Sequence, residues 1–207
     1  MIKSISYNEQ EILRDIIKIH CNDKPIELDP TYSRGNFYKD GVKEPVYKFD
    51  IYPQKEGVVQ ANVEHLPLPD SCVEVVIFDP PFLATKGDSL RIKDKSNRMV
   101  KRFGVYPTEK ELFQFYVNSL IEFYRVMKDK GVLIWKCQDK VSGGKQYWSH
   151  VFIMQQAEKL GFYCKDLFIL MSKHRMVPKW QKNQQHARKF HCYYIVLQKI
   201  NKKVLYL

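Results

Sequence analysis

The sequence predicts an α/β fold with a mostly parallel sheet. Short apolar strand segments alternate with longer segments that carry apolar residues at helical spacing. The segment 74–78 (EVVIF) is almost wholly apolar, which is typical of a strand that is buried on both faces. The 207 residues suit one domain of ordinary size, so we expect a single domain over residues 1–207. A hydrophobic content of 44% is enough for a core and argues against wholesale disorder.

The first half of the chain predicts one helix and four strands. Apolar residues recur near helical spacing over residues 7–20, which indicates an amphipathic helix. A short strand at 25–29 is expected to lead into a turn-rich stretch that ends at Gly35. Three further strands are expected at 46–52, 58–61 and 74–78.

The second half predicts two helices and three strands. Thr108 and Glu111, three residues apart, form a capping-box pattern that begins a helix, and we expect Gly131 to end it. Another helix is expected over about residues 149–160, stopped by Gly161. The remaining strands are expected at 132–135, 166–171 and 192–197. The last two strands are joined by about twenty residues, a length that is uncommon unless the loop is functional.

The formal net charge of +11 is concentrated in two segments. Residues 83–107 carry a net charge of +5, and the chain from Leu167 onward has nine Lys or Arg and no Asp or Glu. This distribution is typical of a protein that binds a phosphate backbone, although a basic surface kept for solubility has the same pattern. We expect loops 83–107 and 172–191 to be substrate-binding insertions. Their candidate contact residues are Lys86, Arg91, Lys101, Arg102, Arg175, Lys179, Trp180, Lys182 and Arg188.

Several classes of protein are disfavoured by composition. No apolar run approaches the ~18 residues needed to span a bilayer, and the first twenty residues lack the apolar core of a signal peptide. We therefore expect a cytoplasmic protein without membrane association. The five cysteines are scattered and odd in number, which indicates free thiols rather than disulfides, and we expect no metal site. The oligomeric state cannot be inferred from the sequence.

The most informative motif is Asp79-Pro80-Pro81-Phe82, directly after the apolar strand segment. The carboxyl ends of strands are where open α/β sheets bind ligands. Two consecutive prolines stiffen the turn and remove two N–H donors, so the turn offers acceptors only. Such a turn suits a flat group with an –NH2, whose hydrogens the Asp79 carboxylate and the Pro80 carbonyl can accept while Phe82 stacks on its face. The exocyclic amine of adenine or cytosine fits this description.

This motif resembles the [DNS]-P-P-[YFW] signature of the class I S-adenosylmethionine-dependent amino-methyltransferases. The stretch Ala61-Asn62-Val-Glu-His-Leu66-Pro-Leu-Pro69-Asp70 resembles that family's G-D-x-x-x-L-P-x-P-D, with Asn62 where Asp is usual. The stretch from Arg188 to Lys199 resembles the R-x-x-H-x-Y-x-L-V-x-x-K ending of bacterial and phage members. The resemblance implies a Rossmann-like fold with a mostly parallel seven-stranded sheet and helices on both faces.

The resemblance also implies roles for individual residues, with S-adenosylmethionine as cofactor. Asp29, Pro30, Ser33 and Gly35 stand where the family binds the methionine end, although the usual F-x-G-x-G turn is absent. Asp50 stands at the position that binds the ribose, and Asn62 at the position that contacts the cofactor adenine. The catalytic residues would be Asp79, Pro80, Pro81 and Phe82.

The expected activity is methylation of a nucleobase amine in DNA, at adenine N6 first and cytosine N4 second. In a duplex the target base must first leave the stack. Two alternatives remain open. One is the same chemistry on RNA, as in rRNA amino-methyltransferases, although the phage-type ending favours DNA. The other is a nucleic-acid-binding module on this fold that has no catalytic turnover.

Overall fold

The computed structural model describes residues 1–84, 106–174 and 186–200. Its central feature is an eight-stranded sheet with the strand order β1-β9-β10-β6-β5-β2-β3-β4. The strands are β1 (Ile5–Ser6), β2 (Leu28–Asp29), β3 (Tyr47–Asp50), β4 (Val59–Gln60), β5 (Val73–Phe78), β6 (Met127–Cys137), β9 (Phe162–Met171) and β10 (His191–Lys199). The helices are α1 (Glu9–His20), α4 (Glu109–Val126) and α5 (Ser149–Leu160), and β7 (Lys140–Ser142) pairs with β8 (Lys145–Tyr147) in a separate hairpin.

The sheet is mostly parallel. Strands β4, β3, β2, β5 and β6 form a continuous parallel series, and β10 is inserted antiparallel between β6 and β9. From β2 the chain builds outward to β3 and β4 and then returns to β5 on the other side of β2, which makes the β2/β5 boundary a topological switch point. Ligands bind at such points, beyond the carboxyl ends of the strands. The predicted α/β fold with a mostly parallel sheet is confirmed, and the sheet has eight strands rather than the expected seven because β1 pairs with β9 at the edge.

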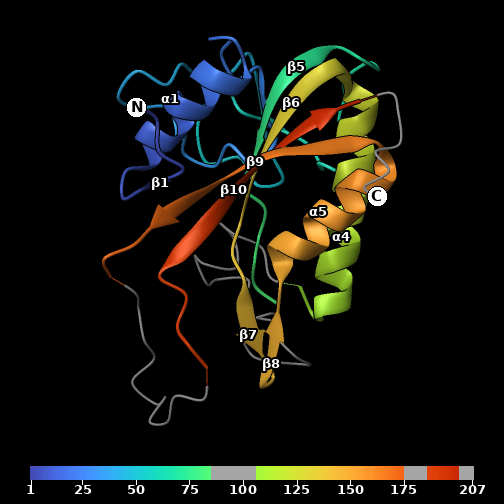
Figure 1. Cartoon of the computed structure of the whole chain (residues 1–207). Coiled ribbons are helices and arrows are strands. Elements are labelled where there is room, and N and C mark those ends of the chain that lie inside the picture. Colours follow the sequence, from blue (N-terminus) through green and yellow to red (C-terminus); the bar gives the residue numbers. More distant parts are fainter. Residues whose placement is uncertain (85–105, 175–185, 201–207) are drawn as a thin grey trace.

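Helices cover both faces of the sheet, with α1 on one side and α4 and α5 on the other (Figure 1). Successive residues of a strand point to opposite faces, so each central strand contributes to two cores. Val75 and Ile77 of β5 pack with α1, whereas Val76 and Phe78 pack in the core that contains α4 and α5. Residues of β6 and β10 divide in the same way: Val132, Ile134, Tyr194 and Val196 on the α1 face, and Leu133, Trp135, Ile195 and Leu197 on the other.

The expected end of the long helix at Gly131 is wrong. Helix α4 ends at Val126, because Met127 already has extended dihedrals and begins β6. Gly131 lies inside β6, where a Cβ would be 2.9 Å from the backbone oxygens of Glu74 and Lys128. The glycine therefore permits close backbone approach at an irregularity of the β5–β6 pairing rather than ending the helix.

Two short features were not predicted from the sequence. Strand β1 has only two residues, too few for a hydrophobic period to be recognised. The β7–β8 hairpin turns at Gly143 and Gly144, whose φ values of 56° and 74° suit the tight two-residue turn of a hairpin. Among the described residues, none of the helices has the length and apolar character needed to cross a bilayer.

Candidate active site

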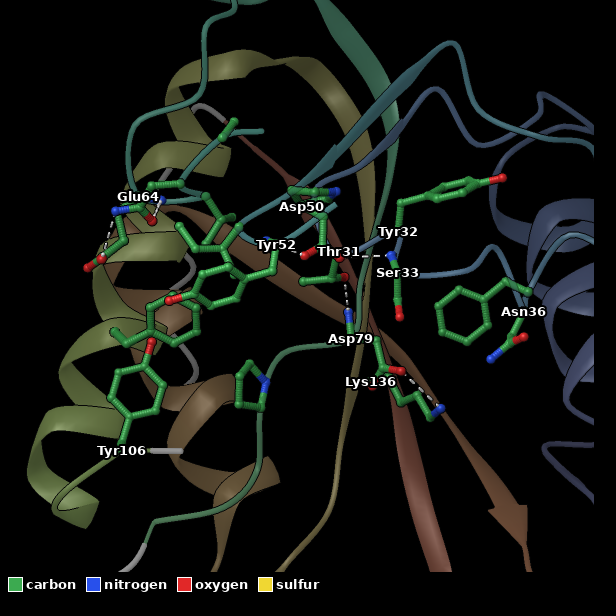
Figure 2. A pocket seen from close by; sticks show the side chains of 18 of the residues that line it. Thr31, Tyr32, Ser33, Asn36, Asp50, Tyr52, Glu64, Asp79, Tyr106 and Lys136 are labelled. Carbon is green, nitrogen blue, oxygen red and sulfur yellow. Dashed lines mark hydrogen bonds and ion pairs between the residues drawn. The ribbon is translucent and has the colours of Figure 1, made fainter. Parts of the chain in front are cut away.

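A cavity of about 600 Å³ lies at the carboxyl ends of β2, β3, β4 and β5, where the topology predicts a ligand (Figure 2). Its volume is within the usual range for small-molecule and cofactor sites. The cavity is lined by Glu9, Pro30, Thr31, Tyr32, Ser33, Asn36, Phe37, Asp50, Ile51, Tyr52, Ala61, Asn62, Val63, Glu64, Asp79, Pro81, Tyr106, Phe115 and Lys136.

The cavity lining is acidic although the chain as a whole is basic. Among the lining residues that the structure describes, Glu9, Asp50, Glu64 and Asp79 contribute four carboxylates, against the one ammonium of Lys136. Low-dielectric walls lined by one sign of charge concentrate ligands of the opposite sign. The cavity therefore suits a cationic ligand, with aromatic and aliphatic side chains available for a flat apolar portion.

Asp50 ends β3 and presents its carboxylate to the cavity (Figure 2). Its two oxygens accept hydrogen bonds from the backbone N–H groups of Ser33 and Tyr52, both at 2.8 Å. Burial raises the pKa of the Asp50 carboxyl, while these two hydrogen bonds oppose the rise. The Asp50 carboxylate thus joins the turn after β2 to the end of β3 and lines the cavity beside them.

Asp29 takes a supporting position and does not line the cavity. Its side chain is 1% exposed and accepts hydrogen bonds from the Thr31 backbone N–H at 2.8 Å, the Thr31 hydroxyl at 3.2 Å and the Tyr38 hydroxyl at 2.7 Å. Burial is the main reason that the pKa of its carboxyl is raised to about 7. Asp29 therefore fixes the turn after β2 from behind, while Pro30 and Ser33 of the same turn reach the cavity.

Gly35 also lies behind the cavity lining. Its φ of 71° is left-handed, and a Cβ would be 2.5 Å from the Tyr32 hydroxyl oxygen. Gly35 thus allows the turn to fold against Tyr32, which is itself 2% exposed and lines the cavity. The single glycine of this turn is required by backbone conformation and by packing.

Asn62 lies after β4 and lines the cavity. Its side-chain oxygen accepts a hydrogen bond from the Glu64 backbone N–H at 3.1 Å, which makes a local turn. The Glu64 carboxylate accepts a hydrogen bond from the Asn118 amide at 2.7 Å, so α4 helps to hold this wall in place.

The DPPF corner, residues 79–82, follows β5 and meets the same cavity. The Asp79 backbone N–H donates to the Thr31 hydroxyl at 3.0 Å, and its carboxylate accepts from the Lys136 ammonium at 3.2 Å (Figure 2). Pro81 lines the cavity, and its carbonyl accepts a hydrogen bond from the Tyr116 hydroxyl at 2.7 Å. Pro80 and Phe82 are not among the lining residues; Pro80 is buried, and the Phe82 carbonyl accepts from Lys140 at 2.6 Å.

Most of the residues expected to contact the substrate lie outside the described part of the chain. The exception is Arg188, which is partly buried and does not line the cavity. The others, in segments 85–105 and 175–185, are Lys86, Arg91, Lys101, Arg102, Arg175, Lys179, Trp180 and Lys182. Their expected role stays a prediction.

Three charged residues that line the cavity were not predicted from the sequence as site residues: Glu9, Glu64 and Lys136. Glu9 begins α1, about 70 residues before the DPPF corner, so only the folded chain brings the two together. Lys136 follows the apolar residues VLIW near the end of β6, next to β5 in the sheet. A lysine at the end of a buried strand beside β5 was a signal that could have identified it.

The comparisons with known proteins bear on the fold. No protein-family model matches the chain, and no curated protein matches it. The (4+2)-cyclase SpnF aligns over 92% of this chain and 81% of its own, with 9% identity and a TM-score of 0.50. A proposed DNA modification methylase from Thermus thermophilus aligns over 78% of this chain and 57% of its own, with 14% identity and a TM-score of 0.44. A proposed histamine N-methyltransferase from Thermotoga maritima aligns over 85% and 82%, with 14% identity and a TM-score of 0.44.

At these identities the structural likeness establishes the fold alone. This chain spans 50% and 57% of the length of the Thermus thermophilus methylase in two of its crystal structures. An activity, a substrate and a cofactor for this chain therefore have to be argued from its own residues.

Proposed function

We propose that this protein transfers a methyl group from S-adenosylmethionine to the exocyclic amine of a nucleobase in DNA, at adenine N6 in first place and cytosine N4 in second. The observation that carries the proposal is that the Asp79 corner and the Asp50 carboxylate face one cavity. Methyl transfer requires that the target amine and the cofactor lie in one space. The acceptor proposed for the amine, Asp79, and the acceptor proposed for the cofactor ribose, Asp50, share one cavity. The D-P-P-F resemblance supports the same reading.

The cavity fits S-adenosylmethionine in size, charge and arrangement of groups. We assign Asp50 to the ribose hydroxyls, Asn62 to the adenine, and Pro30 and Ser33 to the methionine end. Asp29 and Gly35 would act through the turn that they hold in shape. The acidic lining complements the positive charges that this cofactor carries on its sulfur and its amino group.

Held by Asp50, Asn62, Pro30 and Ser33, the cofactor would supply a methyl group on a positively charged sulfur; a new N–C bond to the target amine would form as the C–S bond breaks, and the amine would give up a proton to water. The protein's part is orientation. Of the corner, Asp79 and Pro81 line the cavity, and we assign the Asp79 carboxylate to accept an amine hydrogen, which makes the nitrogen lone pair available for attack. Pro81 stiffens the corner with its carbonyl held by Tyr116. The D-P-P-F resemblance alone, and not the cavity lining, assigns the Pro80 carbonyl to the second amine hydrogen and Phe82 to stacking on the base.

The direct test is Asp79→Ala. We expect methyl transfer to fall by about 100-fold or more, the size of effect that follows removal of a positioned transition-state interaction. Binding of S-adenosylmethionine, measured by titration calorimetry, should survive because the ribose and adenine contacts remain. Asp129→Ala is a matched control, because Asp129 is exposed near the start of β6, at the end of that strand remote from Lys136.

Activity of Asp79→Ala within a few fold of wild type would contradict the role given to the corner. Absence of S-adenosylmethionine binding to the wild-type protein at millimolar concentration would contradict the whole proposal and favour a binding module without turnover.

A further inference from the structure

The Lys136 ammonium lies between two carboxylates at the base of the cavity. Its Nζ is 2.8 Å from a Glu9 oxygen and 3.2 Å from an Asp79 oxygen, and its side chain is 15% exposed. It also lies 5.1 Å from the centre of the Phe37 ring and 5.8 Å from that of Tyr194. The Tyr194 hydroxyl donates to the same Glu9 oxygen at 2.6 Å, so the ammonium is held from several sides.

Lys136 is a permanent donor in this position. Burial alone would lower the pKa of the ammonium, but the charges of Asp79 and Glu9 outweigh burial and hold that pKa above its usual value. An ammonium has three N–H donors. Among the described residues, Glu9 and Asp79 account for two of them, and the cavity that Lys136 lines is where a ligand would meet the third.

Asp79 and Lys136 therefore present an acceptor beside a donor (Figure 2). That order of groups is complementary to the Watson–Crick edge of adenine, where the N6 amine stands beside the acceptor N1. Cytosine has the same order, with its N4 amine beside the acceptor N3. Guanine does not, because its N2 amine stands beside an N1–H donor, and its other neighbour, the acceptor N3, lies next to the sugar-bearing nitrogen.

Building on the proposed function, we propose that Lys136 donates a hydrogen bond to the ring nitrogen beside the target amine, N1 of adenine or N3 of cytosine. Lys136 is then a specificity-determining residue. A guanine amine at the corner would place two donors against each other, and an unpaired donor in a partly buried site is costly. The proposal thus excludes guanine N2 as a target and accounts for an ammonium beside the acceptor corner.

The test is a double-mutant cycle on the whole 207-residue chain, with a DNA oligonucleotide that carries the base found to be methylated. One axis compares wild type with Lys136→Met. The other compares the natural base with its deaza analogue, 1-deazaadenine or 3-deazacytosine, in which the ring nitrogen is replaced by C–H. The readouts are kcat/KM for methylation and, separately, the affinity for the oligonucleotide measured by fluorescence anisotropy without cofactor.

For wild type we expect the deaza base to lower kcat/KM by about 10- to 100-fold, the range for one hydrogen bond to a charged group. For Lys136→Met the natural and deaza bases should be used about equally, because the donor is gone. The affinities measured by anisotropy should follow the same pattern: wild type should bind the natural base more tightly than the deaza base, and Lys136→Met should bind both about equally. Lys136→Gln, which keeps a neutral donor, should recover part of the preference for the natural base, and the wild-type comparison remains informative if Lys136→Met does not fold.

Equal use of natural and deaza bases by wild type would overturn the proposal, as would the same deaza penalty in wild type and Lys136→Met. A penalty only with 7-deazaadenine would overturn it too, since another edge would then be read. Methylation at guanine N2 would overturn it while leaving methyl transfer intact. Absence of any base methylation would instead count against the proposed function on which this inference rests.

Discussion

Asp29 links the charge of a single buried residue to the stability of the whole protein. Its carboxyl has a pKa of about 7 in the folded chain against an ordinary value of 3.8, mainly because burial disfavours the charged form. The folded state therefore binds the proton more tightly, and the stabilisation is present below pH 3.8 and is lost as pH rises toward 7. The free energy of unfolding should fall by at most about 1.4 kcal/mol per pH unit within this window.

Asp29→Asn tests this expectation, because the amide has nearly the same shape and cannot ionise. Urea unfolding at pH 5 and pH 7.5 should show a smaller loss of stability in Asp29→Asn than in wild type. Asp129→Asn, at an exposed site, serves as the control and should behave as wild type. Parallel pH profiles for wild type and Asp29→Asn would show that the Asp29 carboxyl titrates normally.

Residue by residue, the sequence predicted which strand ends surround the cavity more reliably than which side chains line it. Asp50, Asn62 and Asp79 lie at or just after the ends of three parallel strands, and all three line the cavity. Asp29 and Gly35 belong to the stretch predicted to be rich in turns, but neither lines the cavity: Asp29 accepts a hydrogen bond from Tyr38, and Gly35 packs against Tyr32. The spacing of residues in a sequence does not reveal which residues of a turn face a cavity and which support the turn from behind. Glu9 and Lys136 come from elements that only tertiary structure brings together.

Helix α4 begins with a reciprocal cap that can be removed by one substitution. The Thr108 hydroxyl accepts from the Glu111 backbone N–H at 3.1 Å, and the Glu111 carboxylate accepts from the Thr108 backbone N–H at 3.2 Å. Thr108→Ala should lower the free energy of unfolding by about 1 kcal/mol, measured from denaturant midpoints at constant slope. Thr108→Ser, which keeps the hydroxyl, should lose much less; equal losses for Ala and Ser would assign the effect to packing of the Thr methyl group.

Elements with a strong pattern were predicted well, and their ends less well. The apolar segment 74–78 became β5, buried on both faces, because its residues pack alternately with α1 and with α4. The expected strands at 132–135 and 192–197 are cores of the longer strands β6 and β10. The extra length carries polar residues such as Lys136 and Gln198, whose strand conformation comes from pairing with neighbouring strands rather than from hydrophobicity.

At the scale of the whole molecule, positive charge is concentrated in two sequence segments while the cavity is acidic. If segment 83–107 contacts phosphates, nucleic-acid affinity should fall steeply with salt, by about 150-fold between 50 and 200 mM for about four contacts with duplex DNA. Changing Lys86, Arg91, Lys101 and Arg102 together to Gln should weaken binding and make the log–log salt dependence shallower by about 0.9 for each phosphate that is no longer neutralised. Affinity for S-adenosylmethionine should stay unchanged.

A charge-matched control comes from outside the basic segments. Lys3, Lys18, Lys39 and Lys43 are all exposed, and changing these four to Gln alters the net charge equally. Fluorescence anisotropy over a salt series separates the two variants. Equal weakening by both would show that binding depends on net charge rather than on segment 83–107.

The measurement that tests the central claim most directly is the chemical identity of the methylated product. The protein is incubated with S-adenosylmethionine that carries a deuterated methyl group, with DNA and RNA in parallel, and the nucleosides are analysed by mass spectrometry. We predict labelled N6-methyladenine, or N4-methylcytosine, in DNA, and about 100-fold less label or lower in DNA treated with Asp79→Ala. Label confined to RNA would contradict the DNA assignment, and absence of label from every nucleobase amine would contradict the account as a whole.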